Sequence, residues 1–364
     1  MAATTEPTRP PITPSKPFRI ALYPGDGIGR EVTEAAVQVL DAVSASGEAA
    51  VDLHWFDWGC DHHARHGCVA PGDFLDTLIS FDAIFLGAVG WPQRLPDHVT
   101  LAPLIEMRQA FDLYACVRPA KTFQGVSSLL ANPGPIDMAV VRENSEGEYV
   151  AMGGSLRNGA SQELAVESAV HTRHGIERIL RFAFDLARTR RGKVTVVTKS
   201  NAMRYGYVLW DTVHDQVAAD YPDVITDRQH VDAACMNFVR QPNEFDVVVG
   251  SNLFGDILTD LSGAITGSIG LNASANLNPS RQFPSLFEPV HGSAPDIAGQ
   301  NRANPVGAIL AIAMMLDWLG ITAAGTRVRS VVEATLASGA GTPDIGGTLS
   351  TTEMTAEVVK RVLA

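Results

Sequence analysis

The chain has 364 residues, of which 46% are hydrophobic and 19% charged, with a formal net charge of -12. Its length allows two domains with sizeable cores, and its acidic balance argues against nucleic acid or anionic membranes as partners. Four scattered cysteines indicate reduced thiols in the cytoplasm rather than a disulfide framework, and the apolar run 308–316 is too short to span a membrane.

The order of apolar segments predicts an α/β fold with strands and helices in alternation. Residues 1–17 are rich in proline and are expected to be a disordered tail rather than a secretory signal. The predicted strands cover residues 19–23, 51–56, 82–86, 138–142, 194–198 and 245–250. The predicted helices cover 30–43, 74–79, 101–111, 176–188, 253–264, 307–319, 326–338 and 351–363, and a hairpin-like arm is expected over 146–170.

The segment "YPGDGIGREV" (residues 23–32) joins the first strand to the first helix. A dinucleotide fingerprint requires G-x-G-x-x-G, but here the third glycine comes one residue early, at Gly29. The pattern therefore favours a plain strand-to-helix turn over a Rossmann site.

Two carboxylates lie four residues apart in "DVVVGSNLFGDILTDL", Asp256 and Asp260. At this spacing they share one face of a helix that follows a buried strand. Neighbouring carboxylates in a partly buried setting repel each other unless a cation lies between them, and hard oxygen ligands suit Mg²⁺ or Mn²⁺. The alternative is a solvated helix face, which the apolar residues between the two aspartates disfavour.

Three arginines at the edges of apolar segments, Arg108, Arg118 and Arg142, match the needs of a polycarboxylate substrate. Guanidinium groups bind carboxylates in a bidentate manner and stay charged when desolvated. Tyr149 and Lys199 are candidates for an acid or a base.

The segment "GCDHHARHGC" (residues 59–68) raises the possibility of zinc binding. It lacks a C-x-x-C pair and no second ligand cluster follows, so a polar surface segment is the preferred interpretation.

From Phe18 to the C-terminus the chain resembles the β-decarboxylating hydroxyacid dehydrogenases, which include isopropylmalate, isocitrate, and tartrate or D-malate dehydrogenases. The resemblance rests on the arginines 108 and 118 and on "PGDGIGREV", "VRENSEGEY", "TKSNA", "DVVVGSNLFGDILTDL", "SLFEPVHGSAPDIAGQNRANP" and "PDIGGT". It implies an α/β, isopropylmalate dehydrogenase-like two-domain fold with a non-Rossmann nucleotide site. Residues 18–113 and 267–364 are expected to form a discontinuous cofactor-binding domain, and 114–266 the substrate, metal and dimerisation domain with its extended arm.

The resemblance also implies roles for the candidate residues. Arg108, Arg118 and Arg142 would bind the substrate carboxylates, and Asp256 and Asp260 would bind Mg²⁺ or Mn²⁺ together with Asp232 of the partner subunit. Lys199 of the partner subunit would take the proton from the substrate hydroxyl, and Tyr149 would protonate the enol left after decarboxylation. A homodimer with shared active sites is therefore expected.

The cofactor implied by the resemblance is NAD, with its adenosine end at "HGSAPDIAG" and "GDGIG" near the nicotinamide. The implied binding residues are Ile28, Glu288, His291, Gly292, Ser293, Ala294, Asp296, Ile297 and Asn304. Asp296 favours NAD over NADP because it would repel a 2′-phosphate, and the NADP-using relatives carry Lys and Tyr at 296 and 297. Gln300 departs from the lysine found in many members.

The substrate is predicted to be a small 2-hydroxy diacid of the D-malate or tartrate type. "LPDHVTL" is similar to a segment of those enzymes, although the following "APLIEMR" is one residue shorter. Isopropylmalate enzymes carry Glu where this chain has Leu101, and isocitrate enzymes carry Ser and Asn where it has Ala102 and Leu104.

Three alternative functions are a 3-isopropylmalate dehydrogenase, a non-catalytic regulatory subunit and a metal-dependent hydrolase. Retention of the acid, base and metal residues disfavours the second. A metal-dependent hydrolase would leave the segment "HGSAPDIAG" unexplained. The serine-containing segments of the chain also lack the G-x-S-x-G elbow of serine hydrolases.

Overall fold

The computed structural model describes residues 16–364, which divide into two compact units. Within the described range, unit 1 comprises residues 16–113, 121–131 and 263–364, and unit 2 comprises 114–120 and 132–262. The predicted tail lies outside the described residues except for its last two positions. The segment 121–131, which the prediction assigned to the second domain, belongs to unit 1, where the Ser128 hydroxyl donates to the Ile265 carbonyl at 2.6 Å.

Five strands of unit 1 lie in the order β2-β1-β3-β12-β11, and neighbours are parallel except for the antiparallel pair β11 and β12. Their bounds are β1 (Phe18–Gly25), β2 (Val51–Trp55), β3 (Ala83–Ala88), β11 (Ala273–Leu277) and β12 (Ser285–Pro289). Strand β3 is buried throughout and β1 nearly so. Parallel strands covered on both faces need continuous apolar runs, which is why these two strands were predictable.

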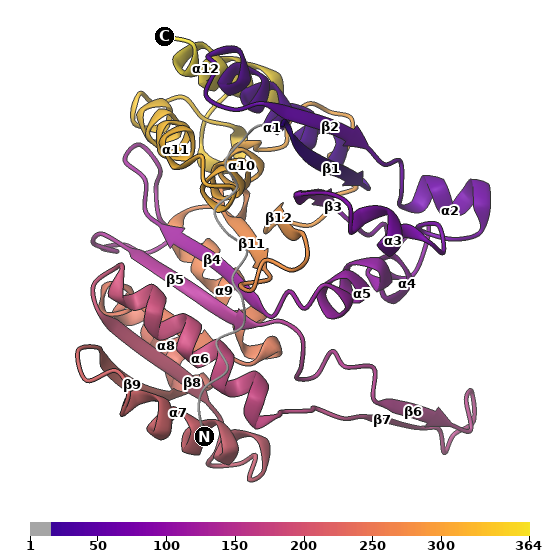
Figure 1. The fold of residues 1–364 in the computed structure, drawn as a ribbon, viewed down its shortest axis with the longest axis vertical. Coiled ribbons are helices and arrows are strands. Elements are labelled where there is room, and N and C mark those ends of the chain that lie inside the picture. Colours follow the sequence, from indigo (N-terminus) through magenta and orange to yellow (C-terminus); the bar gives the residue numbers. More distant parts are fainter. Residues whose placement is uncertain (1–15) are drawn as a thin grey trace. The chain divides into compact units, whose positions relative to one another are not determined.

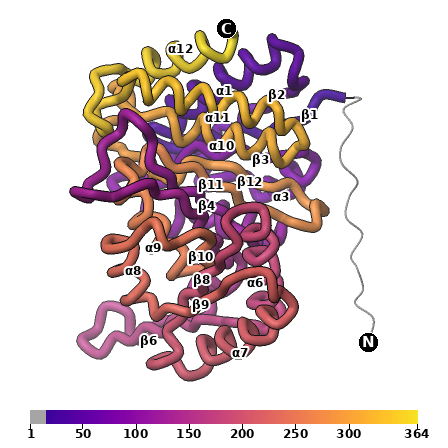
Figure 2. Tube along the Cα trace, turned by 90° about the vertical axis from the view of Figure 1, so that its left-hand side faces the viewer, coloured from indigo at the N-terminus to yellow at the C-terminus, as the bar shows by residue number. Residues whose placement is uncertain are grey.

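The long helices of unit 1 are α1 (Gly29–Ala45), α10 (Val306–Trp318), α11 (Thr322–Ala337) and α12 (Thr351–Val362). Helix α10 packs against α1, α11 and the strands β11 and β12, so it is apolar on almost every side (Figure 2). Helix α12 begins at a capping box formed by Ser350 and Glu353. The predicted start of the helix at 326 was wrong, because α11 begins at Thr322.

The shorter helices of unit 1 are α2 (Cys60–His66), α3 (Phe74–Leu78), α4 (Asp97–Thr100) and α5 (Ala102–Ala110). The single helix predicted over 101–111 was wrong at its start, where two short helices meet. Pro103 lies in the first turn of α5, a position that proline favours because the first amides of a helix have no partner.

The main strands of unit 2 lie in the order β4-β5-β10-β8-β9. They are β4 (Ala115–Lys121), β5 (Asp137–Glu143), β8 (Lys193–Thr198), β9 (Ile225–His230) and β10 (Val247–Gly250). The pairs β5–β10, β10–β8 and β8–β9 are parallel. Their carboxyl ends therefore lie at one edge of the sheet, which is the edge where ligands bind in open α/β sheets.

The helices of unit 2 are α6 (Arg173–Arg188), α7 (Gly206–Ala218), α8 (Val231–Arg240) and α9 (Asn252–Thr266), the last turn of α9 belonging to unit 1. Helix α6 begins three residues before its predicted start because the Thr172 side chain caps the amide of Gly175 at 2.9 Å. The strands β4, β9, β11 and β12 and the helices α7 and α8 were not predicted. Within residues 16–364, no helix has the length and apolar character needed to cross a membrane.

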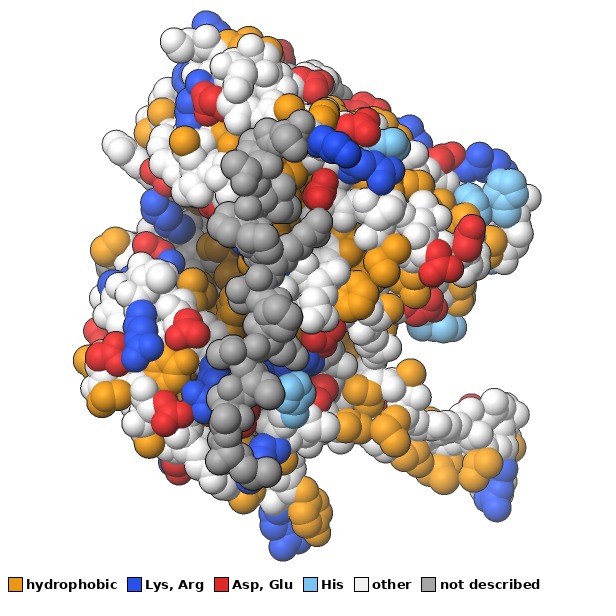
Figure 3. All heavy atoms as spheres, viewed as in Figure 1, with side chains coloured by type: hydrophobic (Ala, Val, Ile, Leu, Met, Phe, Trp, Pro, Cys, Tyr) orange, Lys and Arg blue, Asp and Glu red, His pale blue; other side chains and the backbone are white. Residues whose placement is uncertain are grey.

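A two-stranded hairpin extends from the body of unit 2 (Figure 1). It consists of β6 (Gly153–Leu156) and β7 (Leu164–Glu167), which pair antiparallel and are exposed along their whole length. Apolar side chains lie along it (Figure 3), including those of Met152, Leu156, Leu164 and Val166. The hairpin falls within the predicted arm.

Candidate active site

Asp256, in the second turn of α9, is the centre of a polar cluster in unit 2. Its Oδ1 accepts hydrogen bonds from Arg118 (3.2 Å) and from Arg142. Its Oδ2 accepts one from the Tyr149 hydroxyl at 3.1 Å. The side chains of Arg118 and Arg142 are only 7% and 2% exposed, whereas that of Asp256 is 36% exposed. Buried guanidinium groups remain charged, so Asp256 is a shared counter-ion for both.

Asn252, at the first position of α9, completes this cluster. Its Oδ1 accepts from Arg142 Nε, and its Nδ2 donates to the Glu146 carbonyl, both at 2.8 Å. The close approach of α9 to Arg142 requires Gly255, where an added Cβ would lie 2.6 Å from the Cβ of Arg142. The sequence prediction did not include Asn252, although it lies in the quoted motif, one helical turn before Asp256.

Asp260 lies one turn after Asp256 and is exposed. Partial desolvation of its carboxyl group, followed by the negative charge of Asp256, raises its pKa, while Arg118 and Arg142 oppose the shift. Asp256 and Asp260 share one helix face, and carboxylate oxygens of this kind are ligands that suit a hard divalent cation. Among the residues that the structure describes, no three His, Cys, Asp or Glu side chains gather closely enough to hold a metal ion.

Lys199 and Asp232 form a second pair in unit 2, at 2.7 Å. Lys199 directly follows β8, and Asp232 lies in the first turn of α8 after β9. The hydrogen bond from Lys199 lowers the pKa of Asp232. The structure thus brings these two predicted residues together. The ion pair joins Lys199 to Asp232 and does not include Asp256.

Arg108 lies in unit 1, where it faces Glu288 of β12. The Arg108 guanidinium is 3.3 Å from Glu288 Oε1, which also accepts from Asn276 Nδ2 at 2.8 Å. Both members of the ion pair are buried. The Glu288 carboxylate was predicted to contact the cofactor. In this structure it forms an ion pair with Arg108.

The turn after β1 packs against the segment 291–297 in unit 1. The Ile28 amide donates to the Ser293 carbonyl at 2.8 Å. Gly27 has a φ of 55°, and an added Cβ would lie 2.0 Å from the Ser293 carbonyl oxygen, so only glycine fits there. The buried Asp26 carboxylate accepts from the amides of Cys60 (2.7 Å) and Gly90 (2.9 Å). Two segments predicted to bind the nucleotide are thus adjacent.

His291 is buried at the start of the second of these segments. Its Nδ1 lies 2.9 Å from the Gly292 carbonyl, while Nε2 has no hydrogen-bond partner among the described residues. Burial lowers the pKa of His291, so the ring is neutral. Asn304 lies further along, where it donates to Asp344 at 3.0 Å.

Asp296 is exposed in the same loop. Its carbonyl accepts from Gln300 Nε2 at 2.7 Å, and the Gln300 Oε1 in turn lies 3.4 Å from the Arg302 guanidinium. Gln300, in the place of the family's lysine, thus connects Asp296 to Arg302. The Asp296 carboxylate therefore lies at the surface of the loop.

The cluster 59–68 forms α2 and its C-terminal turn. Cys60 is buried, with a pKa raised to about 12 by desolvation and by Asp26, whereas Cys68 is exposed. His62 Nδ1 lies 2.7 Å from the Cys68 carbonyl. Most of residues 61–68 are exposed, as a polar surface segment would be.

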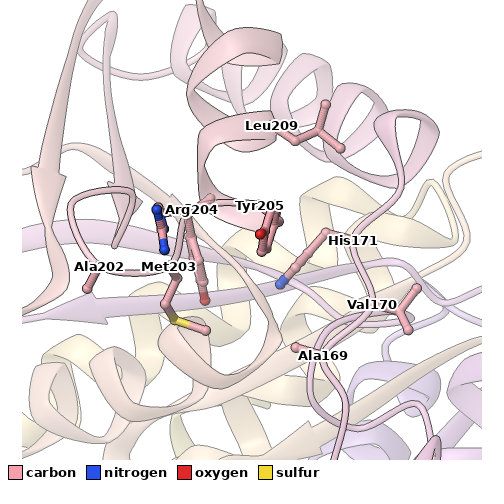
Figure 4. A pocket seen from close by; sticks show the side chains of 10 residues that line it. Ala169, Val170, His171, Ala202, Met203, Arg204, Tyr205 and Leu209 are labelled. Atoms are coloured by element: carbon pink, nitrogen blue, oxygen red, sulfur yellow. The ribbon is translucent and has the colours of Figure 1, made fainter.

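A pocket in unit 2 is lined by the residues directly before α6 and those between Lys199 and α7 (Figure 4). His171, at its wall, accepts from Trp210 Nε1 at 3.2 Å and packs against Tyr207, and burial lowers its pKa. Tyr205 and Met203 are exposed beside it. The aromatic contacts connect the base of the hairpin to the segment that follows Lys199.

The family model for isocitrate/isopropylmalate dehydrogenases matches residues 19–359. The chain belongs to this family. It is 48% identical over 349 residues to a probable tartrate dehydrogenase/decarboxylase of Bacillus subtilis, covering 95% of this chain and 98% of the relative. It is 46% identical over 358 residues to the D-malate dehydrogenase (decarboxylating) of Escherichia coli, covering 96% and 99%.

The structure of the chain is similar to the crystal structure of an isocitrate dehydrogenase from Methylococcus capsulatus, with a TM-score of 0.86 and 37% sequence identity. The match covers 95% of this chain and 100% of the isocitrate dehydrogenase chain. The predicted family and fold class are therefore confirmed.

Proposed function

We propose that this enzyme oxidatively decarboxylates a small 2-hydroxy diacid of the D-malate or tartrate type to a 2-oxo acid and CO₂, with NAD and Mg²⁺ or Mn²⁺. The convergence of Arg118, Arg142 and Tyr149 on Asp256 carries this proposal. The names of the relatives from Bacillus subtilis and Escherichia coli support it.

The three arginines bind and orient the diacid. Arg118 and Arg142 are buried, so their charges are little screened by water. Arg108 pairs with Glu288 in unit 1, and its proposed role is to bind a further carboxylate oxygen of the substrate. Fixed guanidinium groups limit the substrate to one orientation, which favours reaction at a single hydroxyl.

Asp256 and Asp260, with Asp232 of the partner subunit, would hold the divalent ion, which supplies Lewis acidity toward the substrate oxygens. The residues 291–297 and 304 and the turn at Ile28 would hold NAD, which would supply the acceptor for the hydride from C2. Lys199 of the partner subunit takes the hydroxyl proton.

Tyr149 donates the proton that replaces CO₂ on the substrate. Its hydroxyl is held by Asp256 Oδ2, and the Arg142 guanidinium lies 5.3 Å from its ring centroid. Arg142 and Asp256 thus both contact Tyr149 and fix the position of its ring and hydroxyl.

We infer that the active unit is a homodimer in the cytoplasm. Lys199 and Asp232 make their mutual contact away from Asp256, and the hairpin exposes apolar side chains that a second copy would cover. The four cysteines are free, as in a reducing compartment.

A substrate panel tests the function. With NAD and Mn²⁺, D-malate or tartrate should give NADH and CO₂ with kcat/KM at least about tenfold above that for 3-isopropylmalate or isocitrate, because one unmatched substrate group usually costs this much. Preference for 3-isopropylmalate would favour the alternative dehydrogenase. No turnover of any diacid, with the protein folded and metal-loaded, would overturn the proposal in favour of a regulatory subunit.

NAD should be preferred over NADP by about a hundredfold or more in kcat/KM, since like charges brought together cost several kcal/mol. The 2′-phosphate of NADP would meet Asp296, and the nearest cation, Arg302, is engaged with Gln300. Steady-state kinetics with both nucleotides and one diacid measure the preference. Equal efficiency, or a preference for NADP, would contradict the assignment.

A further inference from the structure

We propose that Asn252 is a positioning residue that connects the substrate-binding Arg142 to the loop that carries Tyr149. The inference rests on the function proposed above and adds a residue that the sequence motifs did not assign.

The Asn252 side chain is buried and satisfied at both ends. The residue is 2% exposed, its carbonyl accepts from Arg142 Nε and its amide donates to the Glu146 carbonyl, each at 2.8 Å. A buried amide that loses either partner leaves a polar group unpaired, so both contacts are held in one geometry.

On the arginine side, α9 holds one guanidinium at two points. Arg142 Nε bonds to Asn252, and Arg142 NH1 bonds to Asp256, one helical turn later on the same face. Two hydrogen bonds from one planar group prevent its rotation. If a metal ion engaged Asp256, the Asn252 contact would continue to hold Arg142 in the plane needed by a carboxylate.

On the loop side, Asn252 fixes the backbone three residues before Tyr149. Gly147 has a φ of 80°, and an added Cβ would lie 2.9 Å from the Cβ of Asn252, so the loop lies directly against this side chain. The Glu143 carboxylate accepts from the amides of Ser145 (3.0 Å) and Glu146 (2.8 Å) and fixes the other end of the turn. The distance between the Tyr149 hydroxyl and the substrate therefore depends on Asn252.

Two substitutions separate the two contacts. Asn252→Ala removes both and should raise KM for D-malate about tenfold and lower kcat about 30-fold or more, since misplacement near 1 Å costs about a hundredfold. Asn252→Asp still accepts from Arg142 but no longer donates to Glu146. It should leave KM within about threefold and lower kcat at least about tenfold.

The matched control is Asn278→Ala in unit 1. Asn278 is also buried, and its side chain joins the Asp112 carbonyl to the amide of Gln282. This variant should lower the melting temperature comparably but keep kcat and KM within about threefold of wild type. Melting curves of all variants confirm the folded state.

A selective kcat loss in Asn252→Asp, with losses in both parameters in Asn252→Ala, supports the proposal. The proposal is overturned by wild-type kcat and KM in either variant, or by equal changes of kcat and KM in Asn252→Asp. If Asn252→Ala does not fold, the kinetics of Asn252→Asp alone decide. If wild type turns over no diacid, the proposed function fails separately, and calorimetric titration with succinate still tests Arg142. Affinity should then fall about tenfold in Asn252→Ala and little in Asn252→Asp.

Discussion

Replacing Asp256 with asparagine is expected to lower kcat/KM about a thousandfold with saturating Mn²⁺, because a metal-bound charge is lost where charge develops in the transition state. The same change should strengthen binding of D-malate in EDTA about tenfold, since the carboxylate that pairs with the two buried guanidinium groups no longer competes with the substrate. Asp256 pairs with both Arg118 and Arg142 in this structure, so a diacid that binds these arginines without metal must compete with it. Steady-state kinetics and calorimetry in EDTA measure the two effects.

Asp260→Asn is the matched control for the second effect. Asp260 lies on the same helix but the ion pairs of Arg118 and Arg142 are with Asp256, so removal of Asp260 should weaken metal binding and activity while changing the affinity in EDTA less. Equal affinities for D-malate in EDTA across wild type and both variants would contradict the role of Asp256 as a competing counter-ion.

Mixing an inactive Lys199→Ala chain with an inactive Asp256→Ala chain is expected to restore roughly a quarter of wild-type activity after subunit exchange. In the heterodimer, one site combines the intact Asp256 of one chain with the intact Lys199 of the other, and the second site carries both defects. The estimate assumes random pairing, in which half of the dimers are mixed and each has one working site.

Subunit exchange is verified with two differently tagged chains, and activity is assayed on the exchanged mixture, to which the estimate of a quarter applies. The control is an exchange between two differently tagged chains that both carry Lys199→Ala. A heterodimer that forms but has no more activity than this control would show that each chain builds its site alone.

The sequence by itself determined the family, the α/β class and the position of the acidic pair. Strands β1, β3 and β10 are continuous apolar runs because both faces of a parallel sheet are covered, and such runs are visible without any partner. Asp256 and Asp260 share a helix face through local spacing alone. Elements with weaker local signals were missed, such as β9, whose residues are polar and only partly buried.

The tertiary structure decided which charges meet. Arg118, Arg142 and Tyr149 lie more than a hundred residues before Asp256, and no local pattern states that the three converge on one carboxylate. Arg108, grouped with the other arginines in the sequence, instead faces Glu288, and Asn252 gains its significance only from the two segments that it joins. Side-chain pairing of this kind depends on strand order and register. Buried charges and amides cost free energy unless they are hydrogen-bonded, and the folded sheet decides which groups lie within reach of each other.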